Sequence, residues 1–462
     1  MENPLKTEPK FRPMRIVKFF GIPLLVIGCV VGLIRVGYTL REWQGQWKLS
    51  QVIEDLKSKG ISTNSEAIEL AYHANTSDTD TQAWLDLLAK IDSVEFKEAA
   101  QGVPNFDSSV EIDEWGDSFD TSANWKYAQV SIPFVERQQG LVHRIRELAA
   151  APQPVRFPIR FASLNTLLPE VQSSRGLARL LWLDAQVALH LGDSQRALDD
   201  FLALHNLSRH VEAVPFAISI LVSKSFKGMA LTIAQEGIEQ DFFSDQQLQD
   251  IDDVLARNCD IGDEWNAYCE RELGMCIPVF LDPALASEKS GKPLPARGHD
   301  AIYFIDMMTH LADIPTEDWE LFYKTVSQQN VKFNEDVRSW RGRVDLVLTG
   351  VFVPALTSLS ISSIDRAQHY RQARHGVALR LFQHKHGEFP QSLTELPPFD
   401  RDMRAFKQQS FGYVLAPDGA TLWGGRFKGD NQLISPTIPP TDQQTQESLE
   451  NRGYVWSLEI RK

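Results

Sequence analysis

The chain has 462 residues, 43% of them hydrophobic, and it carries a formal net charge of −14. This hydrophobic content supports buried cores and excludes a wholly disordered chain. The first 41 residues are basic, with seven Lys or Arg against two Asp or Glu, so the remainder carries −19 and is poorly suited to bind nucleic acid or an anionic lipid surface.

The first element in chain order is a predicted membrane span. Phe19 to Ile34 carry no charged side chain, and continuing to Leu40 gives 22 residues, about 33 Å of helix, which is enough to cross a hydrocarbon core of about 30 Å. Basic side chains dominate residues 1–18, which predicts a cytoplasmic N-terminal tail. We therefore expect residues 19–40 to be a single-pass signal-anchor helix in the cell membrane, with an extracytoplasmic body.

Residues near the ends of this run fit the same interpretation. Tyr38, Trp43 and Trp47 lie where an outer aromatic belt is expected, and Arg35 would extend its guanidinium to the outer headgroups. Gly28 and Gly32 form a GxxxG pair, a pattern through which membrane helices form homodimers.

A lipoprotein is the alternative anchor. Val26-Ile27-Gly28-Cys29 resembles the bacterial lipobox, in which the cysteine becomes the lipidated N-terminus. Apolar residues continue past Cys29 to Ile34, however, whereas polar linker usually follows a lipidated cysteine. A cleaved signal peptide is disfavoured because no A-x-A-like site follows the apolar run.

Residues 41–386 predict a mostly helical region. Periodic stretches end at glycines, as at Gly60 and Gly102, and Ser244 with Gln247 has the spacing of a capping box. Residues 103–134 lack periodicity and are acidic and aromatic, so we expect a loop or a short β element there. The acidic side chains of this loop could hold calcium, although they lack the EF-hand spacing. They are Asp107, Glu111, Asp113, Glu114, Asp117 and Asp120.

The clearest unit spans residues 175–210. Two helices are predicted around Leu191-Gly192-Asp193, with small alanines on one face and Ala197, Phe201 and Leu204 on the other. The unit resembles a tetratricopeptide repeat (TPR) hairpin, with matching residues at Ala185, Gly192, Asp193, Ala197 and Phe201. No second copy follows at a 34-residue period, so an ordinary helical hairpin remains the alternative.

Residues 387–462 predict a small C-terminal α+β element. Gly387 ends a long helix, and Ser392 with Glu395 has capping-box spacing. Pro417-Asp418-Gly419 is a strong turn between two short strands, and residues 453–460 are expected to return as a third strand.

The segment RQARHGVALRLFQHKHGEFPQSLTELPPF, residues 371–399, carries a second resemblance. It resembles an element of uncharacterised single-pass membrane-anchored proteins of planctomycete bacteria, in which a long helix runs into H-G-x-[FY]-P-x-S-L and a small β region. The helix-to-loop pattern is also similar to the end of the long helix in type II secretion pseudopilins, over about 30 residues. The first resemblance implies an anchored helical protein and implies no activity.

Candidate chemical sites are few. His299-Asp300 resembles a ligand pair of metal phosphohydrolases, but the flanking ligands are missing. His369, His375, His384 and His386 on one helix are misaligned for a shared metal ion, and we expect a basic solvated face. No nucleophile or phosphate-binding motif is present, so catalytic residues stay unknown and no cofactor or metal is predicted.

The cysteines predict no disulfide framework. Besides Cys29 there are three, Cys259, Cys269 and Cys276, and the last two would lie two turns apart on one helix, too far to bond. Buried free thiols are the expected state.

Two long-range hypotheses complete the sequence interpretation. The basic stretch 366–385 and the acidic stretch 236–272 are expected to face each other and fix the register of the helices; two unrelated surfaces are the alternative. For function we expect a structural or protein-interaction role in the cell envelope with a protein partner, and the alternative is an exported hydrolase whose site is assembled from scattered residues.

Overall fold

The computed structural model of the protein describes residues 22–61, 63, 65–74, 78–107, 125–159, 161, 168–281, 298–339, 342, 346, 348–352, 356–398, 411–417, 419–424, 426–427, 433–434 and 455–459.

The described chain is mainly helical, with short strands near the C-terminus. The helices are α2 (Ile22–Ser58), α3 (Ser65–His73), α4 (Asp78–Asp92), α5 (Val94–Ala99), α6 (Ala128–Arg137), α7 (Gln139–Ala149), α8 (Pro169–Leu191), α9 (Ser194–Glu212), α10 (Ala217–Glu239), α11 (Asp245–Ala256), α12 (Gly262–Leu281), α14 (Gly298–Ala312), α15 (Trp319–Arg338), α17 (Thr349–Phe352), α18 (Leu356–His386) and the 3-10 turn η2 (Leu393–Glu395). The strands are β1 (Gly412–Ala416), β2 (Gly419–Trp423), β3 (Arg426–Phe427), β4 (Leu433–Ile434) and β5 (Val455–Glu459).

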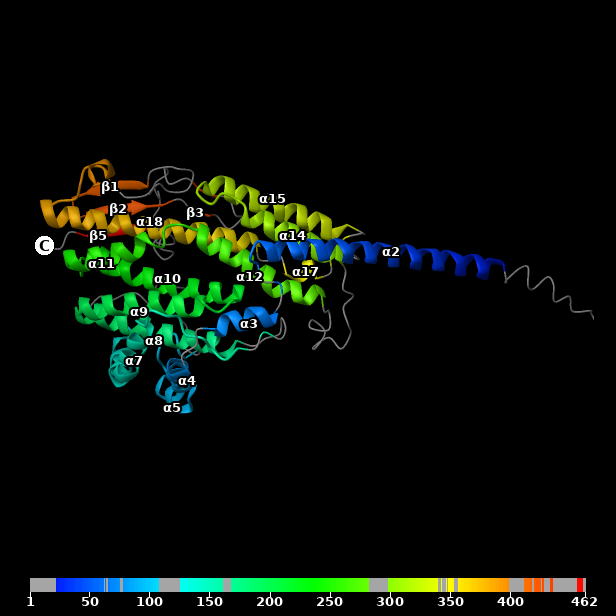
Figure 1. The fold of residues 1–462 in the computed structure, drawn as a ribbon. Coiled ribbons are helices and arrows are strands. Elements are labelled where there is room, and N and C mark those ends of the chain that lie inside the picture. The colour runs from blue at the N-terminus through cyan, green and yellow to red at the C-terminus, as the bar shows by residue number, and fades with distance from the viewer. Residues whose placement is uncertain are drawn as a thin grey trace, which may run out of the picture.

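The body is elongated, and its long helices run roughly parallel to its long axis (Figure 1). The helix α2 enters at one end and projects well beyond the body, whereas the strands β1, β2 and β5 lie at the opposite end (Figure 1). The prediction of a mainly helical chain, arranged as an array or bundle, with a small C-terminal β element is confirmed in its mainly helical content and its sheet.

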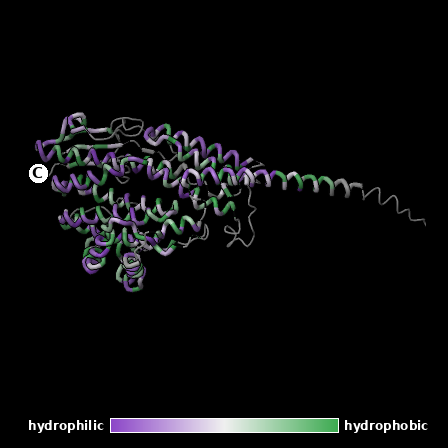
Figure 2. The backbone as a smooth tube through the Cα atoms, viewed as in Figure 1, coloured by the Kyte–Doolittle hydropathy of each residue, from purple (hydrophilic) through white to green (hydrophobic). Residues whose placement is uncertain are grey.

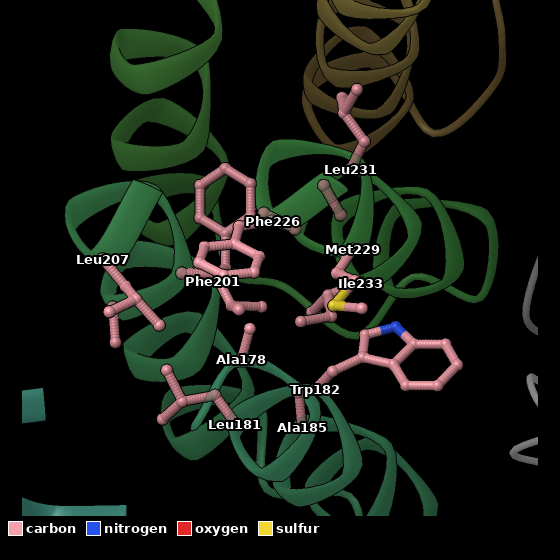
Figure 3. Packing of buried hydrophobic residues seen from close by; sticks show 14 of the residues in the cluster. Ala178, Leu181, Trp182, Ala185, Phe201, Leu207, Phe226, Met229, Leu231 and Ile233 are labelled. Atoms are coloured by element: carbon pink, nitrogen blue, oxygen red, sulfur yellow. The ribbon is translucent and has the colours of Figure 1, made fainter. Parts of the chain in front are cut away.

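The hairpin predicted at 175–210 is formed by α8 and α9. Gly192 ends α8 with a left-handed φ of 78°, a conformation that glycine adopts without steric cost, and the Asp193 side chain caps α9 by accepting from Arg196 N. The small Ala178 and Ala185 of α8 face Phe201 of α9, and α10 covers both helices (Figure 3). This packing explains the sequence pattern of small residues opposite a large one.

A second hydrophobic cluster joins the C-terminal part of α2 to α12, α14, α15 and the first half of α18. Three α2 side chains, Leu49, Ile53 and Leu56, are buried in it. Trp265 of α12 is buried in this cluster, and its indole Nε1 donates to Leu311 O at 2.8 Å. The part of α2 that follows the predicted anchor is thus a structural part of the body.

The C-terminal sheet is antiparallel, in the order β1-β2-β5, and Ala416 pairs with Gly419 across the predicted turn. The third strand, β5, falls where the sequence predicts one. Its Trp456 is 2% exposed and packs on Gly376 of α18. A side chain at Gly376 would overlap the indole, so the glycine allows the sheet to lie directly on the long helix.

The local prediction for residues 103–134 needs correction. Residues 103–134 are not uniformly loop or β, because α6 begins at Ala128 and continues through Pro133. The aromatic residues Phe134 and Trp125 are buried in the main cluster, so the acidic segment is followed by a core helix. Residues 108–124, with the proposed calcium ligands except Asp107, lie outside the described residues.

Among the described residues one helix, α10, has the length and hydropathy to cross a membrane. Of its apolar 18-residue stretch, 67% is buried inside the body, as in a core helix. The predicted span 19–40 lies partly outside the described residues, and nothing is described of the side chains of residues 22–28. The described part of this run is helical, with Cys29 exposed and free. The membrane span stays a prediction.

Candidate functional site

The basic face of α18 meets acidic side chains from α10 to α12. The hypothesis that stretches 366–385 and 236–272 face each other is confirmed, because ion pairs follow the helix along its length. They are Arg366–Glu264 at 3.5 Å, Arg371–Asp260 at 3.7 Å, Arg374–Asp252 at 2.6 Å, Arg380–Asp241 at 3.6 Å, and His384 with Asp241 at 2.6 Å and Asp245 at 2.5 Å.

The part of this face from Arg366 to Arg380 is interior, which corrects the prediction of a solvated face there, whereas Lys385 and His386 at its end are exposed. Arg380 is fully buried and donates to the last carbonyls of α10, Ile238 O and Glu239 O, at 2.7–3.0 Å. His375 is 8% exposed and packs against Phe411, and burial lowers its pKa to about 4. Its imidazole is therefore neutral at pH 7 and serves packing.

His384, near the end of the helix, behaves differently. Both ring nitrogens lie within hydrogen-bonding distance of carboxylates, those of Asp241 and Asp245. Partial burial would lower the pKa, but these two hydrogen bonds outweigh it, so the pKa of His384 is raised. The ring bridges the turn between α10 and α11 to α18.

A second polar group lies at the junction of α10, α12 and α18. Lys224 Nζ of α10 donates to Ser363 Oγ of α18 at 2.5 Å and lies 3.3 Å from Glu264 Oε1 of α12. Burial lowers the pKa of Lys224 to about 7, and the Arg366 charge adds to the effect while Glu264 opposes it. Burial would raise the pKa of Glu264, but Arg366 and Lys224 together hold it below its usual value.

Chemically, Ser363 and Lys224 lie at the distance expected of a nucleophile and its base, and the Ser363 hydroxyl donates to Leu359 O at 3.0 Å. A lysine with a pKa near neutrality is partly unprotonated at pH 7 and can accept a hydroxyl proton. The two residues are 139 positions apart in the chain, so no local motif reveals them. Both are enclosed, at 3% and 7% exposure, which keeps solvent from the hydroxyl.

A third polar group ties the 175–210 hairpin to α7. Asp184 and Asp200 are fully buried, and Arg146 Nη2 lies 2.6 and 2.7 Å from their carboxylates. Arg196 makes a further pair with Asp184 at 2.5 Å. Burial, aided by the neighbouring Asp184 charge, raises the pKa of Asp200 well above its ordinary value despite Arg146. Sequence spacing alone does not reveal this network, because Arg146 comes from a separate helix.

His299-Asp300 has a structural role. The Asp300 carboxylate accepts from Leu348 N at 2.8 Å and from Thr349 Oγ1 at 2.6 Å, so it caps the short helix α17. Within the part of the chain that the structure describes, no group of three or more His, Cys, Asp or Glu side chains has a metal-binding arrangement.

The three body cysteines are free and buried. Cys269 and Cys276 lie on one helix, α12, as expected. Burial raises the pKa of Cys259 to about 12, so its thiol is protonated and unreactive at neutral pH.

No protein-family model, no curated protein and no solved structure matches this chain.

Proposed function

We propose that the protein is a single-pass, membrane-anchored scaffold of the cell envelope, with α2 as the anchor and the helical body outside the cytoplasm. The observation that carries this proposal is the projecting part of α2. It leaves the body as a bare apolar helix, coloured largely hydrophobic in Figure 2. An apolar helix without a protein partner requires a nonaqueous environment.

The exposed side chains lie on all sides of this helix. Val30, Val31, Leu33, Val36 and Leu40 are each 49–72% exposed. Every other side chain described between Cys29 and Leu40 is exposed as well, so the body covers no side of this part of the helix. Lipid would contact a helix on every side. The positive-inside distribution of the N-terminal basic residues and the resemblance to planctomycete anchored proteins support the same anchor and orientation.

Ion pairs of the body favour a scaffold over an enzyme. The polar groups described above are paired with one another and buried, so they hold helices in register. A few large apolar side chains remain at the surface for a protein partner, such as Ile218 and Leu221, which lie about one turn apart on α10 and are 38% and 40% exposed.

Protease accessibility tests the orientation. In cells with a permeabilised outer layer, we expect added protease to digest the body while a cytoplasmic marker stays intact. The membrane fraction should retain the protein through alkaline washing, and a variant lacking residues 19–40 should be released. An untouched body in permeabilised cells would refute the extracytoplasmic assignment.

The Cys29→Ser variant separates the two anchors. A helix anchor predicts unchanged membrane retention, since no step of it needs the thiol. Loss of both fatty-acid labelling and retention in this variant would instead establish the lipoprotein.

An exported hydrolase is the second candidate, and the Ser363–Lys224 contact is the observation that favours it. In this alternative Ser363 is the nucleophile and Lys224 its base. A fluorophosphonate probe that labels the wild type and fails to label Ser363→Ala would support it. The scaffold proposal predicts no labelling of Ser363 in either protein.

A further inference from the structure

The anchor and the body share one helix. The helix α2 is continuous from Ile22 to Ser58, so no flexible linker separates the exposed apolar segment from the part that is buried in the body. Rotation of the body relative to the exposed apolar segment therefore requires the helix itself to bend or break.

The docking contact is a close backbone approach. A Cβ on Gly298, at the start of α14, would lie 2.2 Å from the carbonyl carbon of Gly45. Gly298 N also donates to Glu42 Oε1 at 3.1 Å. Both glycines lack the side chain that would separate the helices, so this end of α14 is fixed to α2 at that point.

The distance from lipid to body is short. Leu40 and Gly45 are five positions apart, about 8 Å along a helix axis. The headgroup region on each side of a bilayer is about 5–8 Å thick, so the body begins where the headgroups end.

Two tryptophans flank Gly45 on the helix. Trp43 and Trp47 lie two residues before and after Gly45, about 160° around the helix from it, and so face away from α14. They are 67% and 55% exposed. Helical side chains lean toward the N-terminus, here toward the lipid, which brings both indoles to the level that Trp prefers.

On these grounds we infer that one end of the body, formed by the start of α14 and the end of α12, rests directly on the lipid headgroup layer. This inference rests on the proposed membrane anchor and adds to it a lipid-facing surface and a fixed orientation. Leu281, the last residue of α12, belongs to this surface: it is 48% exposed, and its neighbour Phe280 contacts Phe304 of α14 at 5.4 Å between ring centroids. The three-stranded sheet then lies at the end farthest from the bilayer (Figure 1).

Fluorescence quenching at matched positions tests the inference. Val36, Leu281 and Val414 are 57%, 48% and 50% exposed, so an environment-sensitive dye on a cysteine at each reports position rather than burial. The full chain with Cys29→Ser is labelled as Val36→Cys, Leu281→Cys or Val414→Cys and reconstituted into phosphatidylcholine vesicles. The vesicles carry a nitroxide on either the headgroup or the acyl chain.

We expect acyl-chain nitroxide to quench the dye at position 36, headgroup nitroxide to quench it at position 281, and neither to quench it at position 414. Quenching at 281 no greater than at 414, with 36 still quenched, would overturn the lipid-facing surface and leave the anchor intact. An unquenched position 36 would overturn the anchor and the inference together.

Discussion

At the scale of single residues, Gly376 is one of the points where the C-terminal sheet contacts α18. A Cβ there would lie 2.5 Å from the Trp456 indole, which is itself 2% exposed and has little room to move. We expect Gly376→Ala to lower the free energy of unfolding by about 1–3 kcal/mol, since overpacking outweighs the gain in helix propensity. Thermal or urea unfolding measures the change.

The matched control is Gly228→Ala. Gly228 also lies inside a helix, α10, but an added Cβ would meet no atom within 4 Å. The propensity gain should then appear alone and stabilise by up to about 1 kcal/mol. Equal effects of the two substitutions would contradict the proposed contact of Trp456 with Gly376.

Asp200 gives a pH-dependent prediction. Its carboxyl has a raised pKa in the folded protein, so the native state holds a proton that the unfolded state has already lost above pH ~4. The Asp200 carboxyl therefore adds to the free energy of unfolding at acid pH. This contribution declines as pH rises through the pKa of the folded protein, and it amounts to about 1.4 kcal/mol per unit by which folding raises the pKa. Asp200→Asn resembles the protonated form and removes this decline.

We accordingly expect Asp200→Asn to be more stable than the wild type at pH 8 and to lose that advantage near pH 4. Denaturant unfolding at both pH values measures the difference. The contrasting variant is Asp184→Asn, which should destabilise at both, because Arg146 and Arg196 both pair with that carboxylate. An Asp200→Asn effect independent of pH would refute the buried proton.

At the scale of elements, Arg380 of α18 has no exposed surface and closes the end of α10. Its guanidinium donates to Ile238 O and Glu239 O, carbonyls that no residue inside α10 can satisfy. We expect Arg380→Ala to destabilise by about 3 kcal/mol or more, because the buried carbonyls Ile238 O and Glu239 O and the Asp241 carboxylate each lose a charged donor. Hydrogen exchange should show faster opening of the last turn of α10.

Arg144→Ala is the control for charge removal. Arg144 pairs with Glu147 at 2.7 Å, but both side chains are about half exposed. Water replaces such a pair readily, so we expect a change of about 0.5 kcal/mol or less. A comparable loss in both variants would show that buried location has no part in the Arg380 effect.

Most element boundaries follow from local chemistry that a sequence displays. Helices end at Gly192 and Gly387, where left-handed backbone is needed, and both predicted capping boxes are present, at Ser244 and Ser392. The charge complementarity between α18 and the acidic stretch 236–272 was also predictable from the sequence, because basic residues dominate the first and acidic residues the second.

The burial of α18 was not predictable in the same way. A row of Arg and His is typical of a solvated face, and only the surrounding acidic helices make an interior position favourable for it. The Lys224–Ser363 contact and the Arg146 network join residues from distant helices, with no periodicity to indicate the pairing. The α6 helix was missed because its core residues follow an acidic segment without periodicity and because it contains Pro133, which normally argues against a helix interior.

At the scale of the whole molecule, α2 has two different environments along one helix. Its projecting part has exposed apolar side chains, whereas Leu49, Ile53 and Leu56 are 1–8% exposed within the second hydrophobic cluster. The border between these parts lies near Gly45, where α14 begins. A membrane protein whose body folds independently of its anchor would instead show its core contacts only after the helix ends.

Two truncations test this division. A chain beginning at residue 41 keeps every buried α2 side chain and should give a soluble body with the wild-type far-UV spectrum and a cooperative thermal transition. A chain beginning at residue 59 removes Leu49, Ile53 and Leu56 from the core, which costs about 4.5–9 kcal/mol at about 1.5–3 kcal/mol for each side chain. That loss is comparable to the total stability of a typical domain, so the shorter chain should aggregate or unfold without cooperativity. Equal stability of the two truncated bodies would show that α2 is only an anchor and contributes nothing to the fold.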